Sequence, residues 1–294
     1  SSPEALHQTV MAHPAAHLIF LVDETDLFIA KDAEQEYAWT NVMRALSSQG
    51  KASFVLAGHQ ALHNAASAAD HPLRNFGHVL RLGPLDLDAA KQMILDPFSA
   101  LDLQFAEESR TVSWICEQTG CRPHLLARLC VAIVERCQTM GSSVISFDDV
   151  QHAAQTRKFL LDAFDRWERD KIHPLDRAIL RLALLHPGAR TTDLFLLLHD
   201  QGASVSEEDV EQSLTRLYAW HYALIADATG MLHCPVPLFR FWLTDLRPEQ
   251  TAGRIWSSPE QRLREDLEND LAEIRAIPPT LQEDQRTSES PQRW

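Results

Sequence analysis

Two short segments in the first sixty residues consist almost entirely of apolar side chains. They are residues 17–22 (HLIFLV) and residues 52–57 (ASFVLA). Apolar runs of this length, without polar alternation, are typical of strands buried on both faces of a parallel sheet. Residues 34–46, between them, repeat apolar side chains at helical spacing. The order predicts a βαβ unit, and residues 80–85 (LRLGPL) predict a third extended segment.

From residue 88 onward the apolar pattern changes to helical spacing. Predicted helices cover residues 88–96, 107–118 and 124–137. Pro97, Gly120 and Pro123 mark their boundaries. A charged helix over residues 147–168 is predicted to connect this all-helical part to the next unit of the chain.

A second compact unit is predicted over residues 174–246. Its expected elements are helices 175–185, 192–199 and 207–220, with Ser206 as N-cap of the third, and a hairpin joining 222–226 to 231–235. Three helices followed by a two-stranded ribbon is the winged-helix order. Its aromatic side chains are expected to be core: Trp220, Tyr222, Phe239, Phe241 and Trp242.

The last part of the chain, residues 248–294, is polar, and its end is expected to be disordered. Within it, Ser258-Pro259 predicts a helix start. This helix places four apolar side chains on one stripe, at Leu263, Leu267, Leu271 and Ile274. The stripe is expected either to dock a partner or to pack on the chain itself.

Composition narrows the range of functions. The chain of 294 residues is 45% hydrophobic and 23% charged, which is enough apolar material for folded cores. The net charge of −14 argues against a surface built to neutralise nucleic-acid phosphates. The five cysteines form neither a CxxC pair nor a metal-finger spacing, which favours buried thiols in a reducing compartment. With no apolar run of eighteen residues and no signal pattern, we expect a cytoplasmic protein without a membrane span.

Asp23 and Glu24 follow the first apolar run directly. Phosphoryl transfer needs one carboxylate for the Mg²⁺ shell and another to orient or deprotonate water. Both must lie at the carboxyl edge of the sheet, where nucleotides bind. The alternative is that the two acids merely begin a loop or cap a helix after an ordinary core strand.

Four segments occur in an order that resembles the STAND ATPases and the related origin-binding-type AAA+ proteins. They are Asp23-Glu24-Thr25-Asp26, residues 54–58, Gly83-Pro84-Leu85, and Thr119-Gly120-Cys121-Arg122-Pro123. In that family the first is Walker B, the second carries sensor 1, and a Gly-x-Pro element of a helical lid packs on the nucleotide base. The resemblance spans about Leu18 to Leu246.

The resemblance implies an α/β plus all-α fold. It divides the chain into a partial parallel-sheet P-loop NTPase core (1–85), a helical lid (86–146), a linker helix (147–170), a winged helix (171–247) and a polar tail (248–294).

The resemblance also implies roles for individual residues, with ATP and Mg²⁺ as cofactors. Asp23 would bind Mg²⁺ through water, and Glu24 would be the catalytic base. Gly58 or His59 would be the sensor, although a histidine is unusual there, and His59 with His63 is too common a spacing to indicate a metal site.

The lid and a neighbouring copy would supply cationic groups. Arg122, before Pro123, would contact phosphate, although Cys121 replaces the usual glycine. Arg74 and Arg81 are candidate arginine fingers acting on another copy. Ordinary surface arginines would have the same sequence context.

No GxxxxGK[ST] sequence occurs in the chain, and about 20 residues precede Asp23. The first residue is Ser, so we expect a fragment of a longer protein. An upstream segment or another chain would supply the phosphate-binding loop, and this polypeptide alone is expected not to hydrolyse ATP.

The sequence leaves three functions open. The first is a nucleotide-dependent switch that self-associates and signals through an effector of unknown identity. The second is a DNA-binding replication or partition factor. It is disfavoured because residues 171–247 carry seven basic against nine acidic side chains, and four acids lie in the first turns of the recognition helix. The third is an inactive scaffold with vestigial acids.

Overall fold

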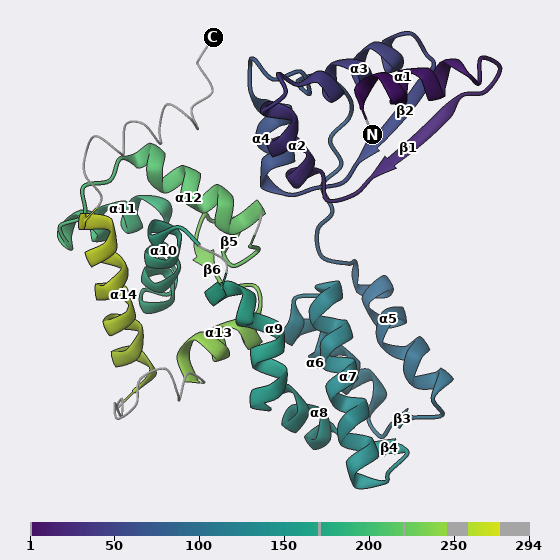
Figure 1. Ribbon diagram of the computed structural model, residues 1–294. Coiled ribbons are helices and arrows are strands. Elements are labelled where there is room, and N and C mark those ends of the chain that lie inside the picture. The colour runs from purple at the N-terminus through teal and green to yellow at the C-terminus, as the bar shows by residue number, and fades with distance from the viewer. Residues whose placement is uncertain (1, 170–171, 220, 246–257, 277–294) are drawn as a thin grey trace. The chain divides into compact units, whose positions relative to one another are not determined.

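The computed structural model describes residues 2–169, 172–219, 221–245 and 258–276 (Figure 1). The chain divides into two compact units, an N-terminal unit that ends at Arg81 and a C-terminal unit that spans Leu82–Pro278. Across these described ranges, no helix combines the length and the apolar character needed to cross a bilayer.

The N-terminal unit is a two-stranded parallel sheet with its connecting helices. Its elements are α1 Pro3–Met11, β1 Leu18–Val22, α2 Thr25–Ala33, α3 Ala38–Ser48, β2 Ala52–Leu56 and α4 Gln60–Ser67. The strands pair in parallel from Leu18 opposite Ala52 to Val22 opposite Leu56. Both predicted strands are therefore present, and their carboxyl ends lie side by side.

The helical connection differs from the prediction of a single helix over residues 34–46. α2 ends at Ala33 and α3 starts at Ala38, and the turn between them holds Glu36 and Tyr37 at φ 53° and 59°. The buried carboxylate of Asp32 accepts the backbone N–H groups of Trp39 and Thr40, both at 2.9 Å. This acceptor stabilises the start of a new helix, which the apolar spacing could not indicate.

Among the described residues of this unit, helices cover only one face of the sheet. Phe20 and Phe54 stack at 5.2 Å and pack against Leu46 of α3. The side chains that alternate with them point the other way, and Ile19, Leu21 and Val55 are 65%, 78% and 55% exposed. Parallel sheets normally have helices on both faces. The sheet therefore presents an uncovered apolar face.

The predicted third extended segment, residues 80–85, contains no strand. Leu80 and Leu82 are both exposed, and Leu85 packs against the core of the C-terminal unit without strand pairing. A strand needs the backbone groups of a neighbouring edge, and no strand of the described chain pairs with this segment.

The C-terminal unit is mainly helical. Its elements are α5 Leu87–Ala100, β3 Gln104–Phe105, α6 Glu108–Thr119, α7 Pro123–Met140, β4 Val144–Ile145, α8 Phe147–Ala154, α9 Arg157–Arg169, α10 Pro174–Leu185, α11 Thr191–Asp200, α12 Glu207–Ala219, β5 Ile225–Ala226, β6 Leu232–His233, α13 Pro237–Asp245 and α14 Pro259–Ala276. α10 to α12 and the antiparallel β5–β6 hairpin occur in the order that the sequence predicts.

The predicted linker helix over residues 147–168 is two helices, because α8 ends at Ala154 and α9 begins at Arg157. Thr156 lies between them and accepts the N–H of Phe159 at its hydroxyl and that of Leu160 at its carbonyl. α9 is not a solvated connector, since Phe159, Leu160 and Phe164 are buried. The local cap by Thr156 and a second buried stripe explain the break.

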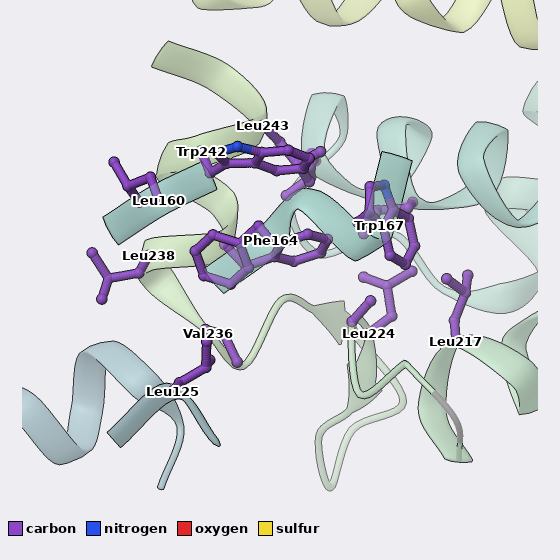
Figure 2. Packing of buried hydrophobic residues seen from close by; sticks show 14 of the residues in the cluster. Leu125, Leu160, Phe164, Trp167, Leu217, Leu224, Val236, Leu238, Trp242 and Leu243 are labelled. Carbon is purple, nitrogen blue, oxygen red and sulfur yellow. The ribbon is translucent and has the colours of Figure 1, made fainter. Parts of the chain in front are cut away.

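The described residues of the C-terminal unit share a hydrophobic core, part of which is shown in Figure 2. Phe164 and Trp167 of α9 lie at its centre, 5.8 Å from the Trp242 ring and 5.0 Å from the Phe239 ring, respectively. Leu125 of α7 belongs to the same cluster. The predicted core role is confirmed for Phe239 and Trp242, whereas Trp220 lies outside the described residues.

Candidate functional site

The carboxyl ends of β1 and β2 form a rim where four predicted site residues meet. Asp23 and Glu24 follow β1 directly, while Gly58 and His59 follow β2 after one residue, and all four are exposed. The Thr25 N–H donates to the Ala57 carbonyl at 2.9 Å, which joins the two strand ends beyond the sheet. The sequence placed these acids at a parallel-sheet edge, and the structure has them there.

The two acids have different backbone environments. Glu24 adopts φ 50°, in the left-handed region, at the step between β1 and α2. Its N–H donates to Asp23 Oδ1 at 2.8 Å, which orients the Asp23 carboxylate. This turn directs the chain sharply from strand to helix, so both carboxylates remain at the rim.

Asp26, the fourth residue of the same motif, connects the two rim loops. Its Oδ2 accepts the His59 N–H at 2.5 Å, and its Oδ1 accepts the Ala61 N–H at 2.8 Å. A Cβ at Gly58 would come within 2.5 Å of Asp26 Oδ2, so only glycine allows this approach. Asp26 thereby supplies the N-terminal cap of α4 and fixes the Gly58-His59 loop.

Asp26 is not among the site residues predicted from the sequence, because its role depends on a helix far along the chain. The α4 helix starts at Gln60, and its N-cap residue His59 makes no side-chain capping hydrogen bond. A helix without its own cap needs an acceptor from elsewhere in the chain. Asp26 provides it from 33 and 35 residues away along the sequence.

Asp26→Ala is expected to destabilise the N-terminal unit by about 1–2 kcal/mol, as removal of a helix cap does. Urea unfolding followed by circular dichroism measures the change. Asp70→Ala, which removes an exposed carboxylate of the same unit, is the matched control and should have little effect. An equal loss of stability in both variants would contradict the capping role.

The same contact makes stability depend on pH. Burial raises the pKa of Asp26, but the backbone N–H groups of His59 and Ala61 outweigh it, so its pKa lies below the ordinary value. The stabilisation is therefore present above the unfolded pKa of about 3.9 and is lost as the pH falls through the lower folded pKa. The difference in the free energy of unfolding between wild type and Asp26→Ala should therefore become smaller as the pH is lowered. A difference that stays constant through this pH range would contradict the role of the Asp26 carboxylate.

The candidate arginines of this unit are exposed. Arg74 donates to the Ala69 carbonyl at 3.3 Å, and its own carbonyl accepts from the Arg44 guanidinium. Burial and then the positive charge of Arg81 lower the pKa of His63. Their assignment as arginine fingers stays a prediction.

Arg122 and Pro123 belong to the other unit, at the turn between α6 and α7. The Arg122 guanidinium donates to the His221 carbonyl at 3.0 Å and lies 5.8 Å from the Tyr222 ring centroid. Burial lowers its pKa. These contacts attach the turn to the loop after α12, and the predicted phosphate contact of Arg122 and Pro123 stays a prediction.

The turn between α6 and α7 also has an unusual backbone conformation. Cys121, which stands where the resemblance predicts glycine, adopts φ 53°. A Cβ at Gly120 would lie 3.1 Å from the Pro235 carbonyl oxygen. The turn therefore packs closely against the segment that leads into α13.

The described residues contain no cluster of three or more His, Cys, Asp or Glu side chains that could hold a metal ion. This does not conflict with a Mg²⁺ role at the rim, because Mg²⁺ in phosphoryl-transfer sites takes one or two carboxylates and fills its shell with waters and phosphates. The exposed, oriented carboxylate of Asp23 fits that donor set. The five cysteines are free, and burial raises the pKa of Cys130 to about 12, which keeps it a neutral thiol.

Comparison with known proteins shows the fold. A Walker-type ATPase of Pyrococcus abyssi, paby2304, superimposes with a TM-score of 0.56 at 16% identity, over 82% of this chain and 67% of that chain. A RuvB mutant of Thermotoga maritima gives a TM-score of 0.42 at 13% identity, over 80% of this chain and 72% of its own. No family model and no curated protein matches the sequence. The chain therefore has a fold like that of a P-loop ATPase.

Proposed function

We propose that this chain is part of a Mg²⁺-dependent ATPase of the STAND or AAA+ type, in which nucleotide state controls assembly. One observation carries the proposal: Asp23 and Glu24 lie together at the carboxyl rim of a parallel strand pair. Ligands of open α/β sheets bind at this edge. The fold likeness to a Walker-type ATPase supports the same assignment.

In this proposal Asp23 and Glu24 have different roles. Asp23 would hold the Mg²⁺ shell, and Mg²⁺ when bound neutralises charge on the transferring phosphate. Glu24 would accept a proton from the attacking water, or orient that water. The Gly58-His59 loop, fixed by Asp26, would lie beside the transferred phosphate as the sensor.

The phosphate-binding loop would come from a strand–loop–helix segment outside these 294 residues. The uncovered sheet face supports such a segment, since Ile19, Leu21 and Val55 expose apolar surface that a further helix would bury. The carboxylates at the rim also need a cationic, N–H-rich partner to hold triphosphate. Arg74 or Arg81 of one copy would act on the nucleotide of the next.

Residues 174–245 would form a winged helix. Its role would be to report the nucleotide state, and not to bind DNA. Its α12 begins with Glu207, Glu208 and Asp209, which repel phosphates. The loop after α12 is also tied to the turn before α7 through the Arg122 hydrogen bond to the His221 carbonyl.

Asp23→Asn tests the metal role in the full-length protein that carries the phosphate-binding loop. The Mg²⁺ concentration for half-maximal ATP hydrolysis should rise about tenfold or more, because one of very few carboxylate ligands is lost. Glu34→Gln, at the far end of α2, is the control and should leave the Mg²⁺ dependence unchanged. ATP binding that is undetectable in wild type would reject the proposal in favour of an inactive scaffold.

A further inference from the structure

The C-terminal helix α14 lies along α10 and also contacts α13 (Figure 1). Its apolar stripe is buried, with all four anchors in the hydrophobic core: Leu263, Leu267, Leu271 and Ile274. An amphipathic helix that lays regularly spaced anchors against a groove is a common mode of peptide recognition. The α10 face therefore has the form of a helix-binding groove.

Charged side chains set the register of this contact. Arg177 of α10 donates to Asp270 at 2.8 Å and to Glu273 at 2.6 Å. Arg181, one turn further along α10, pairs with Asp270 and lies 3.7 Å from Asp266. The Arg181 and Asp270 side chains are only 6% and 5% exposed, so these charges meet away from water.

The wall of the groove does not depend on α14. On its other side α10 is joined to α12, because Asp176 accepts hydrogen bonds from Ser213 at 2.7 Å and from Arg216 at 2.7–3.1 Å. α10 also packs on α11 and β6. The arginine-bearing face would therefore keep its place when α14 leaves.

α14 also carries its own local determinants of helix formation. Ser258 accepts the Gln261 N–H at 3.2 Å, Pro259 occupies the first turn, and Arg264 pairs with Glu260 at 2.7 Å.

We propose that the Arg177–Arg181 face of α10 is a docking groove for an acidic amphipathic helix of a partner protein, and that α14 occupies it as an internal competitor. The partner helix would carry aliphatic residues at the α14 spacing of four, four and three, with acids opposite both arginines. A buried ion pair adds little net affinity but rejects helices that would leave Arg181 facing an apolar or cationic side chain. Acidic character is therefore the specificity determinant.

A fluorescent peptide of residues 258–276 tests the groove with the full chain as receptor. Asp270→Arg in the chain repels the internal helix from both Arg177 and Arg181, so the peptide should bind this variant at least tenfold more tightly than wild type. The second substitution Arg181→Asp restores one internal ion pair and removes one partner of the peptide, so the double variant should bind the peptide more weakly than the single variant. Glu260→Arg makes the same charge change at the exposed Arg264 pair and should behave as wild type.

Several results would overturn the proposal. One is a folded Asp270→Arg chain that binds no peptide. Another is peptide binding that the substitution Arg181→Asp does not change. Hydrogen exchange on wild type gives a test that needs no variant: α14 amides should exchange at least tenfold faster than α10 amides, and equal rates would mean that α14 never leaves alone. Dimers of wild type that Arg181→Asp abolishes would overturn it as well, since the occupant would then be the α14 of a second copy.

Discussion

Asp176→Ala is expected to destabilise the C-terminal unit by about 3–5 kcal/mol, the usual cost of removing one partner from a buried ion pair. The Asp176 carboxylate is buried and accepts a forked pair of hydrogen bonds from Arg216, at 2.9 Å from Nε to Oδ2 and at 2.7 Å from the terminal nitrogen to Oδ1. Without Asp176, the Arg216 guanidinium would have no carboxylate there, and Ser213 would lose its acceptor.

Urea unfolding of the full chain, followed by tryptophan fluorescence, measures this loss. The matched control is Asp88→Ala, which removes a carboxylate that is 93% exposed and 3.9 Å from Lys91 in the same unit. Exposed pairs contribute about 0–1 kcal/mol, so the control should unfold close to wild type. Similar midpoints for the two variants would show that the α10–α12 pair contributes no more than a surface contact.

Glu24→Gln is expected to lower ATP hydrolysis by about 10²- to 10⁴-fold in the full-length protein, the range that general-base catalysis supplies. Glutamine has nearly the same size but cannot accept the proton, so nucleotide binding should persist while turnover stops. Phosphate release and fluorescent-nucleotide binding, measured on the same preparation, separate the two effects.

Glu34→Gln is again the matched control. It makes the same substitution at the C-cap of α2, at the other end of this helix from the rim. If hydrolysis by Glu24→Gln equals that of wild type, Glu24 is not the base, whatever the role of Asp23. If both binding and hydrolysis are lost, Glu24 contributes to holding the nucleotide complex instead.

The strands β1 and β2 and many of the helices could be predicted from the sequence because their signals are local. The apolar runs that become β1 and β2 need no distant partner to be recognised, and the four anchors of α14 repeat at helical spacing. The sequence also placed Asp23 and Glu24 at a strand end, where the structure has them. Two helices were predicted too long because acceptors within a few residues start a new helix, as Asp32 and Thr156 do. The strand predicted over residues 80–85 is absent.

The contacts that define the sites were decided by tertiary structure alone. Asp26 caps a helix more than 30 residues away, Asp176 meets Arg216 40 residues away, and Arg177 meets Asp270 93 residues away. Each acid is locally an ordinary polar residue of a helix, because periodicity reports only neighbours three or four positions apart. Packing selects which of many acids and arginines meet in a low-dielectric interior, and that choice depends on the whole fold.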